Sequence, residues 1–450
     1  MPAARRAPAP ARLAPAFALA LALAGLAAPA AAQLRVDITE GVAAPMPIAV
    51  PPFPAQAPAE TPAGETGALG RQVAEIIEAN LRGSGLFRPV DRSGFPLVLM
   101  PQVTSPGFQQ WRATAAQALV TGFVAANADG TLTVGCYLYD VFAETELARQ
   151  GFTVQPAGWR RAAHKCADLV YSRLTGEEPY FDSRIVYVSE TGPRTRRIKR
   201  LAIMDQDGAN HRFLTSGQNL VLTPRFSPNQ QTITYMSFEA DRPRVWLYDL
   251  GTGRQRPVGS FATMSFAPRF SPDGQGLLFS VTGGGGSNIV AYDIASGATR
   301  QLTRGSAIDT SPSYSPDGRR IVFESDRGGR QQLYVMNADG SGAERISFGE
   351  GQAASPVWSP RGDLIAFTRI QGGRFRIAVI RPDGTGERVL TDGWQDENPS
   401  WSPNGRVILF SRQQRNGQTS LFAVDLTGRA ERRVPTPLEA SDPAWGPLLP

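Results

Sequence analysis

The sequence predicts an α/β N-terminal domain followed by an all-β, six-bladed β-propeller that is closed by its C-terminal strand. Three observations predict this fold. A Ser-Pro phrase recurs at nearly constant spacing, four strand-like runs fit between successive copies, and the first and last copies are incomplete in complementary ways. The phrase opens with an aromatic residue at Phe226, Phe270, Tyr314, Trp358 and Trp401, in steps of 44, 44, 44 and 43 residues, and breaks off at Trp445 after a further 44.

Each phrase predicts a tight reversal of the chain. Ser and Pro suit the first two positions of a type I turn and Gly suits the fourth, as in Ser271-Pro-Asp-Gly. An apolar run such as Ile321-Val-Phe-Glu-Ser follows the turn, and then come a polar loop, a third strand such as Gln332-Leu-Tyr-Val-Met, and a short fourth strand. Four strands in about 44 residues make one propeller blade, which cannot bury its faces alone and must stack in a ring.

The two ends of the repeat region complete one another. The unit from Ile185 to Thr215 has the second to fourth strands of a blade but no Ser-Pro turn before them. The last phrase, Asp442-Pro-Ala-Trp-Gly-Pro, supplies an inner strand and no strand after it. Pairing these two pieces gives six blades and removes the open edge that a linear array would expose.

The region ahead of the repeats predicts a small α/β domain, because strand and helix periods alternate there. Gly176 should end the second helix, and the Pro- and Ala-rich segment 51–62 should be an exposed loop. The expected domains are 33–178 for the α/β domain and 179–450 for the propeller. Strands are expected at 34–38, 48–50, 119–124, 132–142 and 151–154, and helices at 69–81 and 159–174.

Residues 1–32 predict a secretory signal peptide. Arg5, Arg6 and Arg12 accompany an Ala/Leu run, and three alanines precede Gln33. The mature chain is expected to be exported and to have no integral membrane segment. Removing the three arginines lowers the net charge from +6 to +3, and no basic stripe with interleaved aromatic residues is present, so nucleic acid is not an expected partner.

The two cysteines, Cys136 on a predicted strand and Cys166 on a predicted helix, are candidates for a disulfide. Export favours one bridge over two free thiols, and the alternative is a pair of buried, unpaired cysteines.

No catalytic, cofactor-binding or metal-binding residues are predicted, so no enzymatic activity is expected. The two histidines, His164 and His211, lie near no Gly-x-Ser-x-Gly elbow. Asp205-Gln-Asp-Gly begins like a calcium loop, but Ser216 stands where that loop requires Glu, so a turn between strands is expected. The glycines at 283–286 lack the Lys-Ser/Thr pair of a phosphate-binding loop.

The loops that lead into the inner strands should gather at one mouth of the central channel. The segments 219–223 and 263–266 are apolar, whereas 395–398 and 439–442 are acidic, a mixture expected of a protein-binding surface with a polar rim. Capping of strand ends is an open alternative for the acidic residues. The candidate partner-binding residues are Thr223, Met264, Phe266, Asp309, Thr310, Asp396, Glu397 and Asp442.

With these features in order, the mature chain resembles the TolB family, periplasmic proteins of the Tol-Pal cell-envelope system of Gram-negative bacteria. The resemblance covers both domains. The similar segments are Leu34-Arg-Val-Asp-Ile-Thr-Glu-Gly, Pro47-Ile-Ala-Val, Leu81-Arg-Gly-Ser-Gly-Leu-Phe, Ala163-His-Lys, Leu174-Thr-Gly-Glu and Phe181-Asp-Ser-Arg-Ile, followed by the Ser-Pro-Asp-Gly blades. The Pro-rich stretch 51–62 and the cysteine pair depart from the common pattern.

The resemblance implies a non-enzymatic adaptor for outer-membrane integrity and for constriction during cell division. In that family the propeller mouth receives the peptidoglycan-associated lipoprotein Pal, and the segment at about 33–41 engages the inner-membrane protein TolA. Other outer-membrane lipoproteins and colicins are further candidate partners. The residues to which the TolA role would carry over are Leu34, Arg35, Val36, Asp37 and Ile38.

Two other classes of protein fit parts of the sequence. A hydrolase accessory domain would share the Ser-Pro-Asp-Gly turns, but it predicts a catalytic domain after the ring, and this sequence ends at Pro450. A propeller that binds a small ligand or a metal would need polar or histidine side chains on its inner strands. Those strands instead carry the repeated aromatic residues and few titratable groups.

Overall fold

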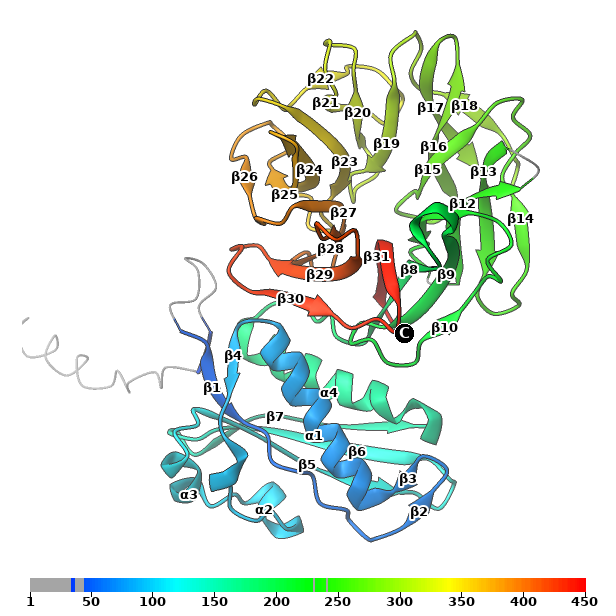
Figure 1. Cartoon of the computed structure of the whole chain (residues 1–450). Coiled ribbons are helices and arrows are strands. Elements are labelled where there is room, and N and C mark those ends of the chain that lie inside the picture. The colour runs from blue at the N-terminus through cyan, green and yellow to red at the C-terminus, as the bar shows by residue number, and fades with distance from the viewer. Residues whose placement is uncertain (1–33, 37–43, 230, 240–241) are drawn as a thin grey trace, which may run out of the picture. The chain divides into compact units, whose positions relative to one another are not determined.

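The structure is a computed structural model that describes residues 34–36, 44–229, 231–239 and 242–450 (Figure 1). The chain divides into two units between Arg35 and Val36, and only Leu34 and Arg35 of the first unit are described. The predicted signal peptide, 1–32, lies outside the described residues. Among the helices of the described part, none has the length and apolar character needed to cross a membrane.

A five-stranded mixed sheet, in the order β4-β1-β5-β6-β7, organises the α/β domain. The second strand in this order, β1, runs parallel to both neighbours, whereas β5, β6 and β7 form an antiparallel meander. The strands are β1 (Met46–Ala49), β4 (Phe87–Pro89), β5 (Ala118–Ala126), β6 (Leu132–Asp140) and β7 (Thr145–Val154), and the hairpin of β2 (Glu60–Thr61) and β3 (Gly64–Glu65) precedes the first helix.

Two long helices, α1 (Thr66–Gly83) and α4 (Trp159–Thr175), pack against each other and on the same face of this sheet (Figure 1). Helix α1 buries the apolar stripe that the sequence predicted, and α4 ends where Gly176 adopts the left-handed conformation, with φ of 73°. The short helices α2 (Met100–Thr104) and α3 (Phe108–Ala113) join the core of the other face through residues such as Trp111. The 3₁₀ turns are η1 (Arg92–Gly94), η2 (Pro156–Gly158) and η3 (Arg194–Arg196).

The Pro-rich segment 51–62 is not wholly an exposed loop, and that expectation was wrong at Phe53. The Phe53 ring is 2% exposed and lies against Gly122 of β5, where an added Cβ would meet the ring at 2.2 Å. Ala55 forms a parallel bridge with Val124 of the same strand. The prolines therefore hold an extended segment along β5, and one aromatic side chain anchors it in the core.

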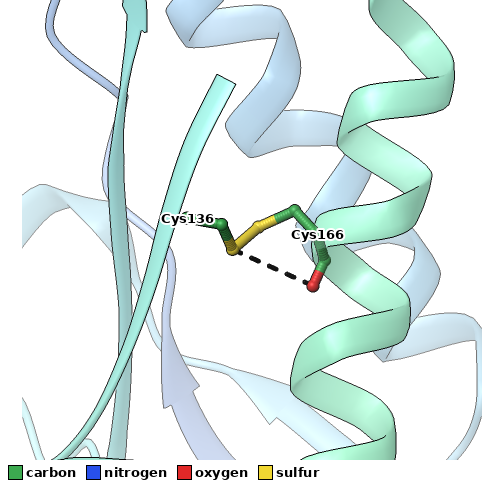
Figure 2. Close-up of a disulfide and its surroundings, with 2 residues drawn as sticks. All are labelled: Cys136 and Cys166. Carbon is green, nitrogen blue, oxygen red and sulfur yellow. Dashed lines mark hydrogen bonds between the residues drawn. A yellow bond between two sulfur atoms is a disulfide. The ribbon is translucent and has the colours of Figure 1, made fainter. Parts of the chain in front are cut away.

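A disulfide joins Cys136 of β6 to Cys166 of α4, with Cα atoms 5.9 Å apart (Figure 2). Both residues are fully buried. The bridge closes a sequence separation of 30 residues and fixes α4 on the meander.

The propeller follows the α/β domain as a series of antiparallel sheets (Figure 1). The first sheet contains β8 (Ser183–Thr191), β9 (Ile198–Asp205), β10 (Arg212–Phe213) and the C-terminal β31 (Glu439–Leu448). The next three contain β11 (Val221–Phe226), β12 (Thr232–Glu239), β13 (Arg242–Asp249) and β14 (Gln255–Pro257); β15 (Ser265–Phe270), β16 (Gly276–Gly283), β17 (Gly286–Asp293) and β18 (Thr299–Gln301); and β19 (Asp309–Tyr314), β20 (Arg320–Ser325), β21 (Gln332–Asn337) and β22 (Glu344–Arg345).

A larger sheet completes the series. It contains β23 (Gln352–Trp358), β24 (Ile365–Gln371), β25 (Arg374–Ile380), β26 (Arg388–Val389), β27 (Gln395–Trp401), β28 (Val407–Gln413), β29 (Thr419–Asp425) and β30 (Glu431–Val434).

Repeated local interactions shape each sheet. The predicted Ser-Pro turns are present; at the second copy, for example, the Gly274 N–H donates to the Ser271 carbonyl at 2.9 Å. Apolar clusters then join neighbouring sheets, as where Trp358 packs with Val322 of one sheet and Phe367 of the next. The aromatic residues of the repeated phrase therefore contribute to packing between blades.

A buried carboxylate fixes the connection between the two domains. Asp168 of α4 accepts hydrogen bonds from the backbone N–H groups of Tyr180, Phe181 and Asp182, at 2.8 to 3.0 Å. These residues lead directly into β8. The three bonds satisfy donors that burial would otherwise leave unpaired.

We expect the double substitution Cys136→Ala/Cys166→Ala to lower the free energy of unfolding of the α/β domain by about 3 kcal/mol. The bridge restricts the unfolded chain over its 30-residue separation, and this effect is lost without it. Urea unfolding with and without dithiothreitol measures the difference. The free energy of unfolding of the variant should not change when dithiothreitol is added. If the wild type without dithiothreitol were no more stable than the variant, the prediction would be wrong.

Candidate protein-binding site

The inner strands of the propeller share a backbone irregularity that the sequence did not reveal. In the described part of the ring, each of β11, β15, β19, β23, β27 and β31 has a β-bulge near its start. A residue other than glycine stands there with φ between 48° and 57°. The bulge residues are Thr223, Ala267, Ser311, Ser355, Asn398 and Asp442. Bulges bend a strand and redirect its side chains, so they shape the rim of the channel at the predicted mouth.

Two of the predicted acidic residues are buried and paired. Asp309 is 1% exposed, and both of its carboxylate oxygens accept from Arg327, at 2.9 and 2.8 Å. Asp396 is fully buried, and Arg412 donates to both of its oxygens, at 2.6 and 2.8 Å. Two-point pairing of this kind holds both side chains rigidly. These aspartates therefore hold neighbouring segments of their own sheets together.

A second acidic group spans neighbouring inner strands. Asp442 accepts from the Thr223 N–H at 3.1 Å and from the Asn398 side-chain amide at 2.6 Å. Glu397 is half-buried beside them. Burial raises the pKa of Glu397, and the negative charges of Asp442 and Asp396 raise it further. The network ties β11 and β27 to the C-terminal strand through side chains.

Glu324 of β20 is a buried carboxyl that the sequence analysis missed. It accepts from the Ser355 N–H at 2.6 Å and from the Ser311 hydroxyl at 3.2 Å, and so links two bulge residues. Burial raises the pKa of Glu324 to about 7, although these two hydrogen bonds act against the shift. The repeat could have revealed Glu324. In the two following blades the same position of the apolar run after the Ser-Pro turn holds uncharged residues, Thr368 and Ser411.

The mouth also carries exposed apolar side chains. We define the mouth loops as the segments 214–220, 258–264, 302–308, 346–351, 390–394 and 435–438, which lead into the inner strands. Among the described residues, one large apolar side chain in each loop is more than a third exposed. These side chains are Leu220, Met264, Ile308, Phe348, Trp394 and Leu438.

The predicted mouth residues thus divide by exposure. Met264 is 43% exposed, while Thr223, Phe266 and Glu397 are half-buried. The other four, Asp309, Thr310, Asp396 and Asp442, are buried. Four further exposed residues of the mouth loops are not among the predicted ones: Ile308, Phe348, Trp394 and Leu438.

Only part of the predicted N-terminal segment can be placed. Val36 is buried, and its N–H donates to the Leu174 carbonyl near the end of α4, at 2.8 Å. Asp37 and Ile38 lie outside the described residues, and Leu34 and Arg35 belong to the other unit of the chain.

One cluster in the described residues has the composition of a metal site. His164, Asp205 and Asp207 each contribute one potential ligand atom, and these three atoms lie within 4.8 Å of one another. The Arg160 guanidinium, however, donates to Asp207 at 2.5 Å and lies 3.9 Å from the Asp205 carboxylate, so it already pairs with both. The backbone carbonyl of Asp205 accepts from the Gly208 N–H, as in the predicted turn. Burial lowers the pKa of His164, whose Nδ1 accepts from the Asn80 side-chain amide at 2.8 Å. The cluster is a buried polar contact rather than a built metal site.

Comparisons with known proteins agree with this architecture. One family model, described as the TolB amino-terminal domain, matches residues 34–147, and another, the TolB beta propeller domain, matches residues 171–449. The Tol-Pal system protein TolB of Rhizorhabdus wittichii is 67% identical over 425 residues, which cover 94% of this chain and 97% of that protein.

Another relative and a solved structure agree. The Tol-Pal system protein TolB of Zymomonas mobilis is 66% identical over 418 residues, covering 93% of this chain and 91% of that protein. The crystal structure of TolB from Acinetobacter baumannii is similar with a TM-score of 0.78 at 30% identity, covering 90% of this chain and 97% of that one.

We expect the propeller to lose stability between about pH 4.5 and pH 7, and Glu324→Gln to remove this loss. The folded state holds the Glu324 proton up to a pKa of about 7, whereas the unfolded state releases it near the ordinary value of 4.5. Stability is therefore fullest at low pH and falls as the pH rises through this window, by up to about 3 kcal/mol.

Urea unfolding at pH 5 and pH 8 tests this expectation. From the lower to the higher pH, Glu324→Gln should gain about 2 to 3 kcal/mol relative to wild type. The control, Glu344→Gln, changes an exposed carboxyl on β22 and should follow wild type. Parallel pH curves for wild type and Glu324→Gln would show that Glu324 does not hold a proton in the folded state.

Proposed function

The chain belongs to the TolB family and is thus a non-enzymatic component of the Tol-Pal system, and from that membership we propose that it acts as a periplasmic adaptor. In this proposal the propeller mouth binds the soluble domain of the peptidoglycan-associated lipoprotein Pal, and the N-terminal segment binds TolA. The adaptor thereby serves outer-membrane integrity and constriction during cell division.

The observation that carries the proposal is the set of exposed apolar side chains in the mouth loops. Isolated exposed apolar residues are ordinary, but their presence in every loop that leads to one end of the channel is characteristic of a protein-binding surface. Trp394, Phe348 and Met264 are residue types that protein interfaces favour. The braced acidic residues beneath them supply a rigid, polar support.

We further propose that the N-terminal segment exchanges between its own protein and TolA, and that occupancy of the mouth shifts this balance. The backbone contact from Val36 to Leu174 supports a packed form. A cavity of about 320 Å³, lined by residues including Pro45, Leu86 and Tyr171, lies close to where the segment joins the domain. It gives a short apolar stretch of the segment room to pack.

We also infer that the ring has six blades and is closed by β31. The larger sheet contains two groups, β23 to β26 and β27 to β30, which meet at the single pair of Phe375 and Gln395. Each group therefore counts as one blade. We also propose a domain boundary at 178/179, which the end of α4 at Thr175 and the start of β8 at Ser183 support. We propose in addition that residues 1–32 are the signal for export to the periplasm.

Calorimetric titration of residues 33–450 with the soluble domain of the lipoprotein from the same bacterium tests the mouth. We expect Trp394→Ala and Met264→Asp each to weaken binding by roughly 30-fold, because truncating an interface anchor costs about 2 kcal/mol or more. Val389→Asp, which changes an exposed apolar residue on the outer strand β26, is the matched control and should bind normally. No binding by wild type would refute the partner, and unaffected binding by both mouth variants would refute the surface.

Deleting residues 33–41 tests the exchange separately. If packing of the segment is coupled to the mouth, the truncated protein should bind the lipoprotein domain with an affinity changed by roughly 5- to 150-fold, the usual range for coupled sites. The same titration measures this change. An unchanged affinity would show that the two sites act independently.

A further inference from the structure

Two arginines occupy one repeated position on consecutive inner strands. Arg225 of β11 and Arg269 of β15 are 44 residues apart, and each stands two residues after its bulge residue. The corresponding residues of the other inner strands are uncharged: Ser313, Val357, Ser400 and Ala444. Neither arginine was predicted as a functional residue from the sequence, which indicated few titratable groups on these strands.

Both side chains line a cavity of about 330 Å³ at the Ser-Pro end of the inner strands. Its wall includes the aromatic residues of the repeated phrase and the prolines that follow them, among them Phe270, Tyr314 and Pro272. The mouth loops lie before the inner strands and these turns lie after them, so the cavity is separate from the proposed protein-binding surface.

Neither guanidinium has a carboxylate partner within ion-pair distance among the described residues. Arg225 is only 8% exposed, and while one of its terminal nitrogens donates to the Pro224 carbonyl at 2.7 Å, its Nε has no partner. Arg269 is half-buried in the same cavity. Burial lowers the pKa of Arg225 to about 10, although the negative charge of Asp442 acts against this shift, and burial together with the Arg225 charge lowers the pKa of Arg269. Arginine nevertheless stays protonated in proteins, so two positive charges face each other here.

The two arginines also stand where some other blades supply an acceptor. In two of the other inner strands the serine at this position accepts a backbone N–H from the next inner strand, as Ser313 does from Trp358 at 3.2 Å and Ser400 does from Trp445 at 2.9 Å. An arginine side chain has no acceptor atom. Arg225 and Arg269 therefore add only donors to this side of the cavity.

We propose that the cavity binds a small oxyanion, a carboxylate or a phosphate, between Arg225 and Arg269. Oxyanions match the fork of donors on a guanidinium, and they neutralise the repulsion between the two charges. The aromatic and proline side chains of the cavity wall accommodate a compact apolar part of the ligand, such as the end of a short peptide.

Titration calorimetry on residues 33–450 tests the site with two probes, inorganic phosphate and N-acetyl-alanyl-alanine, in buffers of equal chloride concentration. We expect saturable binding of at least one probe with a stoichiometry of one. Arg269→Gln should weaken that binding roughly 10- to 100-fold, the loss expected for a charge-assisted hydrogen bond. Arg256→Gln removes the same charge from an exposed position on the outer strand β14 and should bind as wild type does.

A thermal readout separates ligand binding from a purely structural role. Without an added oxyanion, Arg269→Gln should melt no lower than wild type, because the substitution removes a like-charge repulsion. With saturating ligand only wild type and Arg256→Gln should gain thermal stability.

If only phosphate shows saturable binding, the ligand of the cavity is an inorganic phosphate or a phosphoryl group. If only the peptide does, the ligand is a terminal carboxylate. The absence of binding for both probes, or equal binding by Arg269→Gln and wild type, would overturn the proposal. A lower melting temperature for Arg269→Gln that ligand does not affect would also overturn it, in favour of a structural role. Lipoprotein binding at the mouth is measured independently, so either proposal can fail without the other.

Discussion

The antiparallel pairing of β31 with β8 is the constraint on which the propeller depends. It joins residues 439–448 to residues 183–190, so the last strand of the chain completes the first sheet of the ring. The Trp445 indole N–H donates to Ser183 at 2.8 Å, and the Trp445 backbone N–H donates to Ser400 of the neighbouring inner strand. Each sheet buries its faces against its neighbours, so a ring open at this point would expose both a strand edge and an apolar face.

The two ends of the channel differ in charge, because equivalent positions of the repeated blades carry different residues. Glu324, Glu397 and Asp442 lie near the mouth, and the carboxyls of Glu324 and Asp442 accept hydrogen bonds from adjacent blades. Toward the Ser-Pro turns, Arg225 and Arg269 provide positive charge and have no carboxylate in ion-pair contact among the residues that the structure describes. The backbone is nearly the same from blade to blade, so chemistry varies along the channel without any change in fold.

Local chemistry made much of the fold predictable. The Ser-Pro turns, the stripe of α1 and the glycine stop of α4 all depend on residues close together in sequence, and the structure has them where the sequence placed them. The N-terminal α/β domain and the propeller that follows were predicted for the same reason. Phe53 escaped prediction because its burial depends on Gly122, which is distant in sequence and meets it only in the folded domain.

The candidate site was predictable in location but not in detail. The mouth loops follow from topology, whereas the burial of Asp309 and Asp396 depends on Arg327 and Arg412, which reach them from the adjoining strand or the loop after it. Sequence spacing alone cannot show whether a loop aspartate faces solvent or an arginine. The exposed apolar residues were equally hard to recognise, since a single Leu or Ile before a strand is usually buried.

The hydrogen bonds between Asp168 and residues 180–182, which connect the two domains, also have a mechanical consequence. Tension applied to the chain ahead of Val36 would act first on its backbone contact with Leu174, and thus on the C-terminal end of α4. The disulfide at Cys166 anchors that helix to the sheet, and three hydrogen bonds from Asp168 connect it to the residues that open the propeller. Load would therefore pass from α4 to β8, the strand at the seam of the ring, along a short path that the disulfide reinforces.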